Sequence, residues 1–270
     1  MAKRQIGWTE AKISRYIKEG RGQGELALYK PWLTIQDVPS SGRVHRFIGW
    51  KTSREYHLLS DLEFNYLCFC DWADNVIDIR EQFPLDREVT LQIADDLGIK
   101  HPTDNKTNTP IVMTTDFFLT VRKGSSIVYK ARTLKLEKDL NDERVIEKFE
   151  IEKCYWARQG IDWVIVTEKE LPKTLLSNLK FLRDAYFVDE AEKVDLLMNE
   201  WPRFYGALLE NLQAFDKKYN FEMGTAISLY KHALAKKLLK VDMNKKIDLK
   251  EDIDKILLTS YSDVNKRWAQ

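Results

Sequence analysis

Two strand-like runs joined by a short polar turn, at residues 111–121 and 127–133, constrain the fold of this chain most strongly. Both runs are rich in β-branched and aromatic residues, and the turn between them contains Gly124. This pattern predicts an antiparallel β-hairpin. Asp116 interrupts the first run among Thr115, Phe117 and Phe118, and Lys130 interrupts the second after Ile127, Val128 and Tyr129. How these two charges lie relative to each other depends on the length of the turn.

Side chains alternate between the two faces of a strand, and residues paired across a hairpin share a face. A three-residue turn at residues 123–125 would place Asp116 and Lys130 on one face, one pair apart along the ladder. A two-residue turn would place them on opposite faces. On one face, the carboxylate could hold Mg²⁺ while the lysine steadies an attacking water or a phosphate oxygen, as in metal-dependent cleavage of a phosphodiester. An ordinary cross-strand ion pair is the alternative.

The composition is that of a globular protein with one large domain or two smaller ones: 270 residues, 44% hydrophobic and 31% charged. No apolar run reaches transmembrane length and the start lacks a signal-peptide core, so we expect no membrane segment. Cys68, Cys70 and Cys154 form no CxxC pair and have no histidine set nearby. We therefore expect reduced thiols in the cytoplasm and no zinc site.

Charge is segregated along the chain. Residues 1–60 carry 11 Lys and Arg against 5 Asp and Glu, whereas residues 61–119 carry 4 against 12. Basic ends could hold nucleic acid while the acidic middle holds metal ions, although chance clustering on solvated faces is the alternative. The candidate nucleic-acid contacts are Arg15 and Lys18 on the outer side of a helix at residues 10–19, Arg21 in a glycine-rich loop, and Arg43 and Arg46 in a segment where cations alternate with aromatic residues.

Two glutamates lie on predicted helices. Glu63 is in the first turn of a helix at residues 61–72, three residues after Ser60, so a capping box explains it as well as a functional role does. Glu152 lies on the apolar stripe of a helix at residues 142–159, together with Val145 and Phe149. A carboxylate on an inward face needs a partner or a metal, unless it lies at the edge of the stripe and reaches solvent.

Strand, helix and strand between residues 127 and 167 predict a βαβ unit with a right-handed crossover, in which the apolar run 161–167 is a buried parallel strand. After residue 171 the pattern predicts helices at 172–186, 190–199, 202–217 and 223–239. A Lys-rich segment with a possible hairpin around Met243 and Asn244 follows. Helix, turn, helix and hairpin is a winged-helix outline, and a plain helical bundle is the alternative. We place the two domains at residues 1–168 and 169–270.

A helix with Glu63, a strand, a strand with Asp116, a strand with Lys130, a helix and a strand occur in the order that resembles the restriction-endonuclease core of the PD-(D/E)xK nuclease superfamily. More closely, the chain resembles the TnsA family, the endonuclease subunits of heteromeric bacterial transposases. The segments that carry this resemblance are PWLTIQDVPSSGRVHR, HLLSDLEFNYL, VIDIREQFPL, TTDF and the DER…EKFEIEKCYW helix. It covers roughly residues 8–168 and is looser in the carboxy-terminal part.

The resemblance implies an α/β fold, with a mixed sheet flanked by helices, followed by a mainly α, winged-helix-like domain. It implies Mg²⁺ as cofactor, with Mn²⁺ as a substitute, and Glu63 and Asp116 as its ligands. Lys130 would be the lysine of the motif, and Glu152 a further catalytic carboxylate.

One position departs from the superfamily pattern. Val128 stands two residues before Lys130, where the superfamily usually has Asp or Glu. The backbone carbonyl of Tyr129 or the carboxylate of Glu152 could supply the missing metal ligand.

By resemblance, the chain would cut double-stranded DNA at or near the 5′ ends of a transposon, in the bacterial cytoplasm at the nucleoid. Its partners would be a TnsB-like DDE transposase, which cuts the 3′ ends, and a TnsC-like AAA+ ATPase. Two other hypotheses stay open: a catalytically weak or inactive scaffold that bridges DNA and partner proteins, and a stand-alone restriction or repair nuclease.

Overall fold

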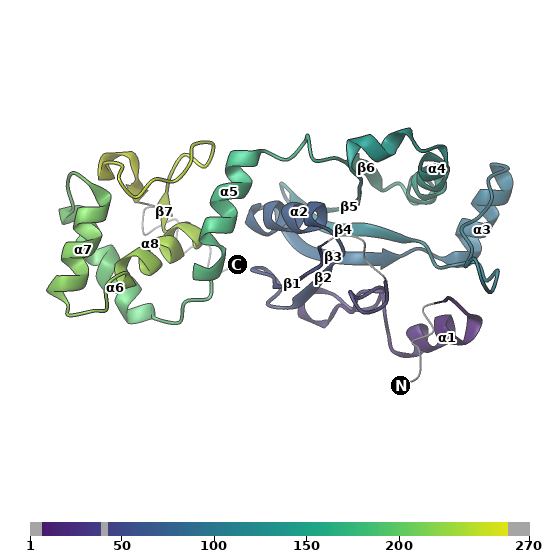
Figure 1. Ribbon diagram of the computed structural model, residues 1–270, viewed down its shortest axis with the longest axis horizontal. Helices are drawn as coiled ribbons and strands as arrows, with labels where there is room; N and C mark the ends of the chain where they lie inside the picture. Colours follow the sequence, from purple (N-terminus) through teal and green to yellow (C-terminus); the bar gives the residue numbers. More distant parts are fainter. Residues whose placement is uncertain (1–6, 39–42, 259–270) are drawn as a thin grey trace. The chain divides into compact units, whose positions relative to one another are not determined.

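The computed structural model describes residues 7–38 and 43–258, and the chain divides into two compact units, Met1–Leu171 and Pro172–Gln270. Figure 1 labels helices and strands of both units. In the N-terminal unit the helices are α1 (Glu10–Lys18), α2 (Asp61–Trp72), α3 (Arg87–Asp96) and α4 (Glu143–Arg158). The strands are β1 (His45–Ile48), β2 (Glu55–Leu58), β3 (Val76–Pro84), β4 (Thr114–Lys123), β5 (Ser126–Leu134) and β6 (Asp162–Val166).

The centre of this unit is a four-stranded mixed sheet with strand order β3-β4-β5-β6. The pairs β3–β4 and β4–β5 are antiparallel, whereas β5 and β6 are parallel and joined through α4. The predicted βαβ unit and the predicted α/β class with a helix-flanked mixed sheet are therefore confirmed. The expectation that residues 161–167 form a buried strand is wrong, because β6 is the last strand in the sheet and most of its residues are partly or fully exposed.

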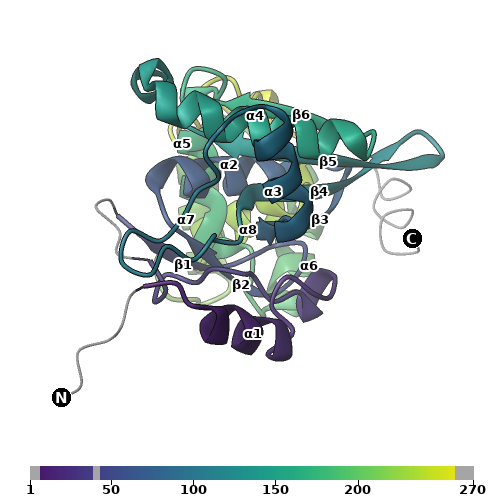
Figure 2. The ribbon, with the colours of Figure 1, turned by 90° about the vertical axis from the view of Figure 1, so that its right-hand side faces the viewer.

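Helices cover both faces of the sheet. Neighbouring residues on a strand point to opposite faces. Phe117 packs against Tyr66 of α2, with ring centroids 5.3 Å apart, and Phe118 stacks on Trp156 of α4 at 4.9 Å. The helices α2 and α4 therefore lie on opposite sides of β4 (Figure 2). The core on the α4 side also contains Ile151.

The turn of the β4–β5 hairpin has two residues, not three. Lys123 pairs with Ser126, and Gly124 between them has φ +61°, the left-handed conformation that tight hairpin turns require. In this register Lys130 pairs with Leu119. Lys130 therefore lies opposite a residue three positions along β4 from Asp116, so the three-residue turn that would place the two charges one pair apart on one face is absent, and that expectation is wrong.

The caps that start the helices follow from the sequence. The side chains of Thr9, Ser60 and Asp142 each accept a hydrogen bond from a backbone N–H in the first turn of α1, α2 and α4. Each cap satisfies a donor that the helix itself leaves unpaired. These starts agree with the predicted helices.

The C-terminal unit is mainly α. It contains α5 (Lys173–Leu182), α6 (Ala191–Glu200), α7 (Leu208–Lys218), α8 (Thr225–Ala235) and the two-residue strands β7 (Leu239–Lys240) and β8 (Leu257–Leu258). The helix α8 is central, since α5, α6 and α7 all pack on it. Within residues 7–38 and 43–258, no helix combines the length and the apolar character needed to cross a membrane.

The hairpin expected around Met243 and Asn244 is wrong. The strand β7 pairs with β8, so a long loop separates them. The buried side chain of Asn178 holds that loop: its Nδ2 donates to the carbonyls of Met243 and Lys245, and its Oδ1 accepts from the N–H of Ile247. The winged-helix assignment stays a prediction.

Candidate active site

Asp116 lies near the start of β4, where the β4–β5 ladder ends. The ladder ends at the pair of Phe117 with Arg132. Asp116 Oδ2 accepts a hydrogen bond of 2.7 Å from the N–H of Leu134 in β5. The side chain of Asp116 thus pairs a backbone donor of β5 beyond the point where the β4–β5 ladder ends. The carboxylate is thereby fixed at this end of the sheet.

Glu63 is held by the first turn of α2. Its N–H donates to Ser60 Oγ at 3.1 Å, Ser60 Oγ donates back to Oε1 at 3.0 Å, and the N–H of Leu59 donates to Oε2 at 2.9 Å. The capping explanation of Glu63 is therefore correct. Capping does not exclude a functional role, because the same hydrogen bonds hold the buried carboxylate of Glu63 close enough to Asp116 for the two charges to interact.

Gln82 of β3 links these two carboxylates. Its Nε2 lies 3.2 Å from Asp116 Oδ1 and 3.5 Å from Glu63 Oε2, while its Oε1 accepts a hydrogen bond of 3.1 Å from Thr114 Oγ1. Gln82 has φ +49° within a strand. A non-glycine residue in this region carries strain of about 1–3 kcal/mol, which is typical of functional sites. Nothing in the sequence analysis singled out this residue.

Glu152 is buried on α4, with an exposed fraction of 3%. The hydroxyls of Thr115 and Thr133 each donate to its Oε1 at 2.5 Å. Both hydroxyls accept indole N–H bonds, from Trp156 at 2.7 Å and Trp163 at 3.0 Å, so their own protons point at the carboxylate. The alternative that Glu152 reaches solvent is wrong.

A cavity of about 290 Å³ opens at this end of the sheet, and Asp116, Thr133, Lys135 and Glu152 are among the residues that line it. Lys135 follows the last residue of β5 and stands two residues after Thr133. Lys148 of α4 also lines this cavity, but Lys135 is the lysine whose charge affects the pKa of the Asp116 carboxyl, so Lys135 is the candidate site lysine. Lys135 was not among the residues predicted from the sequence.

Lys130 and Tyr129 do not reach the site, so their predicted roles there are corrected. Lys130 lies four residues before Leu134, or about 13 Å along the strand, and its Nζ is 4.0 Å from Asp162 Oδ2. Tyr129 pairs with Thr120, one position further from Leu134. The physical reason is the two-residue turn, which sets the register of β5. The position two before the site lysine is then Thr133 rather than Val128.

Burial dominates the electrostatics of the three carboxyls. It raises the pKa of Glu63, with a further rise from the charge of Asp116, and it raises the pKa of Asp116 against the lowering effects of its hydrogen bonds and of Lys135. It raises the pKa of Glu152 to about 7. Buried carboxylates whose charge is not compensated favour binding a cation.

The donor set fits a hard divalent cation. All candidate side chains offer oxygen, and neither Cys nor His lies among them, which suits Mg²⁺ and Mn²⁺ rather than Zn²⁺. Among the described residues, no three His, Cys, Asp or Glu side chains are grouped around one point as they stand. The pair Glu63 and Asp116 would therefore need further oxygen ligands from backbone or water.

Arg21 is occupied within the protein. Its guanidinium donates to Glu19 at 2.8 Å, to Asp37 at 2.6 Å and to the carbonyl of Trp32 at 3.1 Å, and it lies 3.6 Å from the ring centre of Tyr16. It ties α1 to the following loop. The prediction that Arg21 contacts nucleic acid loses its support.

The other basic candidates are exposed. Arg15 and Lys18 lie on the outer side of α1, Arg43 lies two residues before β1, and Arg46 is the second residue of β1. Arg46 has a single long ion pair, 3.9 Å to Glu55. Their contact with nucleic acid stays a prediction.

Comparisons with known proteins show which family the chain belongs to. Residues 73–168 match the family model for the TnsA-like endonuclease N terminal, and residues 170–243 match the model for the TnsA endonuclease C terminal. The chain is 46% identical over 182 residues to the transposon Tn7 transposition protein TnsA of Escherichia coli. The aligned region covers 67% of this chain and 66% of that protein. The chain belongs to the TnsA-like endonuclease family.

Proposed function

We propose that this chain is a Mg²⁺-dependent DNA endonuclease subunit of a heteromeric transposase, which cuts double-stranded DNA at or near the 5′ ends of the mobile element. The observation that carries the proposal is the convergence of Glu63, Asp116 and Lys135. Asp116 at the start of β4 and Lys135, just after β5, line one cavity at this end of the sheet, and Gln82 links Asp116 to Glu63 at the start of α2.

Each residue has a role that its position allows. A bound Mg²⁺ would supply charge stabilisation for the scissile phosphate. Glu63 and Asp116 provide the carboxylate oxygens that would hold it, and Lys135 orients the attacking water by hydrogen bonding. The water oxygen forms the new bond to phosphorus as the bond to the 3′ oxygen breaks, which leaves a 5′-phosphate and a 3′-hydroxyl. Glu152, fixed by two threonines, adds negative charge near Asp116 and supports cation binding.

The partners proposed for the chain are a TnsB-like DDE transposase, which cuts the 3′ ends, and a TnsC-like AAA+ ATPase. The support is the similarity to a transposition protein. The mainly α C-terminal unit is the candidate surface for the ATPase, and Arg43 and Arg46 are candidates for DNA contact.

Replacing Asp116 by asparagine tests the proposed function. The change keeps the size of the side chain and an acceptor for the N–H of Leu134, but removes the charge that would hold the cation. We expect cleavage of transposon-end DNA, assayed with Mg²⁺ and the partner proteins, to fall by about 10³-fold or more. Asp162→Asn, at the exposed carboxylate beside Lys130, is the matched control and should cut as well as the parent. Equal cleavage by Asp116→Asn would reject this site.

One observation favours the scaffold alternative. Thr133 stands where the superfamily usually has Asp or Glu, so one carboxylate of the motif is missing. A scaffold would show no heat of Mg²⁺ or Mn²⁺ binding that Asp116→Asn changes. A stand-alone nuclease would instead cut DNA without any partner protein.

A further inference from the structure

The backbone of Gln82 interrupts β3. The residues on either side pair with β4 in one register, Glu81 with Phe117 and Phe83 with Thr115, but Gln82 between them has φ +49°. An unbranched residue in a strand avoids this conformation unless its surroundings enforce it. The side chain is 2% exposed, so it is fixed inside the protein.

The segment between α1 and β1 supplies that enforcement. Tyr29 Oη donates to the carbonyl of Glu81 at 3.1 Å, and the N–H of Trp32 donates to the carbonyl of Gln82 at 3.2 Å. A Cβ on Gly22 would lie 2.2 Å from Cγ of Pro84, so the segment is also in close contact with the end of β3. Backbone groups around Gln82 are therefore bound from outside the four-stranded sheet.

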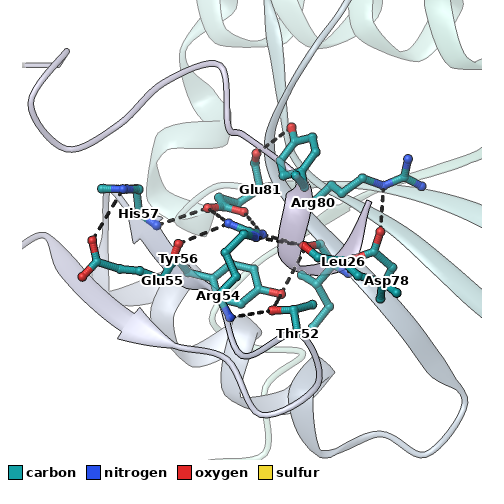
Figure 3. A network of polar contacts seen from close by, with 11 residues as sticks. Leu26, Thr52, Arg54, Glu55, Tyr56, His57, Asp78, Arg80 and Glu81 are labelled. Atoms are coloured by element: carbon teal, nitrogen blue, oxygen red, sulfur yellow. Dashed lines mark hydrogen bonds and ion pairs between the residues drawn. The ribbon is translucent and has the colours of Figure 1, made fainter. Parts of the chain in front are cut away.

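The side chain of Glu81 adds a second anchor. It forms a buried bidentate ion pair with Arg54, with distances of 2.8 and 2.6 Å (Figure 3). The backbone of Gln82 is therefore fixed on both sides, by the ion pair of Glu81 and by the hydrogen bond to its own carbonyl. In this conformation the side chain of Gln82 points toward Asp116 and Glu63.

The chemistry of the amide fixes its orientation. Thr114 donates to Oε1, so Nε2 faces Asp116 Oδ1 and Glu63 Oε2. The opposite orientation would place an acceptor against two carboxyl groups. The NH₂ group of Gln82 consequently stands between the two carboxylates that would hold a cation.

We propose that Gln82 is a positioning residue: its amide holds Glu63 and Asp116 together before a divalent cation binds, and it competes with that cation for their oxygens. This inference rests on the proposed function, since it concerns the same site. It assigns to Gln82 control over how tightly the cation is bound. A cation must displace the two N–H contacts or receive Oε1 in their place.

The test is Mn²⁺ binding to the full chain, measured from the electron paramagnetic resonance of free Mn²⁺, with melting temperatures recorded in chelator and in Mn²⁺. Gln82→Met keeps the length of the side chain and removes the amide. Gln82→Asn keeps an amide that is too short to reach both carboxylates, and asparagine tolerates positive φ, so the backbone is preserved. Gln92→Met makes the same chemical change at an exposed position of α3 and is the control.

We expect both Gln82 variants to bind Mn²⁺ more tightly, Gln82→Met by about tenfold, because the competing hydrogen bonds are lost. In chelator they should melt at lower temperature than the parent, so that the rise in melting temperature on adding Mn²⁺ is larger. Gln92→Met should match the parent in both measurements. Equal or weaker Mn²⁺ binding by the Gln82 variants would overturn the inference alone. A parent protein that binds no Mn²⁺ would overturn the proposed function with it.

Discussion

Lys135→Ala is expected to lower DNA cleavage by about 10²–10³-fold, whereas Lys130→Ala is expected to change it by less than about twofold. Lys135 lines the cavity with Asp116 and Glu152, and its charge acts on the carboxyl of Asp116. Lys130 does not line this cavity: it pairs with Leu119, three positions along β4 from Asp116, and lies beside Asp162. The measurement is the rate of cleavage of transposon-end DNA in the presence of Mg²⁺ and the partner proteins.

The two lysine variants serve as controls for each other, because the same charge is removed at two positions of one segment. Circular dichroism of both variants would establish that they fold alike. A Lys130→Ala protein that loses cleavage while Lys135→Ala keeps it would show that Lys130 and not Lys135 acts at the site, contrary to the positions described above.

Arg54→Met should lower the free energy of unfolding of the N-terminal unit by about 3–5 kcal/mol. Arg54 joins the β1–β2 hairpin to β3 through Glu81, and the side chains are only 8% and 0% exposed (Figure 3). Its guanidinium also donates to the carbonyls of Leu26 and Ile79. Removing it leaves the carboxylate of Glu81 buried without its cation, which is costly because no water replaces the lost charge. Denaturant unfolding measures the effect.

Arg158→Met is the matched comparison. Arg158 pairs with Asp96 at 2.7 Å, but the two side chains are 45% and 52% exposed, so water can replace the lost partner. The expected change is below about 1 kcal/mol. If Arg54→Met and Arg158→Met lowered the free energy of unfolding equally, the buried pair of Arg54 and Glu81 would stabilise the protein no more than an exposed pair does.

The elements that local sequence signals specify were predictable. Ser60 and Asp142 are followed by helices because an N-cap acts within a few residues. The strand β3 contains the buried charged residues Asp78, Arg80 and Glu81, but no local rule identifies Arg54 as the partner of Glu81. That pairing joins segments whose approach is set by the tertiary fold.

The position of the site lysine was harder to predict, because it depends on the length of the β4–β5 turn. One residue more or less in a hairpin turn moves every side chain of the second strand to the other face. Gly124 favours a two-residue turn, and this signal would have removed Lys130 from the site and left Lys135 as the next lysine after β5.

Gln82 carried no signal at all, since its conformation depends on tertiary contacts to Trp32 and Tyr29. Positive φ is predictable at glycine, but at glutamine it follows only from the packing around it. The residue at the centre of the further inference could therefore come only from the three-dimensional structure.

The proposed function requires Glu63 of α2 and Asp116 of β4 to hold one divalent cation. The decisive measurement is calorimetric titration of the full chain with Mn²⁺, in parallel with Asp116→Asn and Glu63→Gln. We expect a binding heat in the parent that is lost or greatly reduced in both variants. Identical binding in all three proteins, or no binding in the parent, would contradict it.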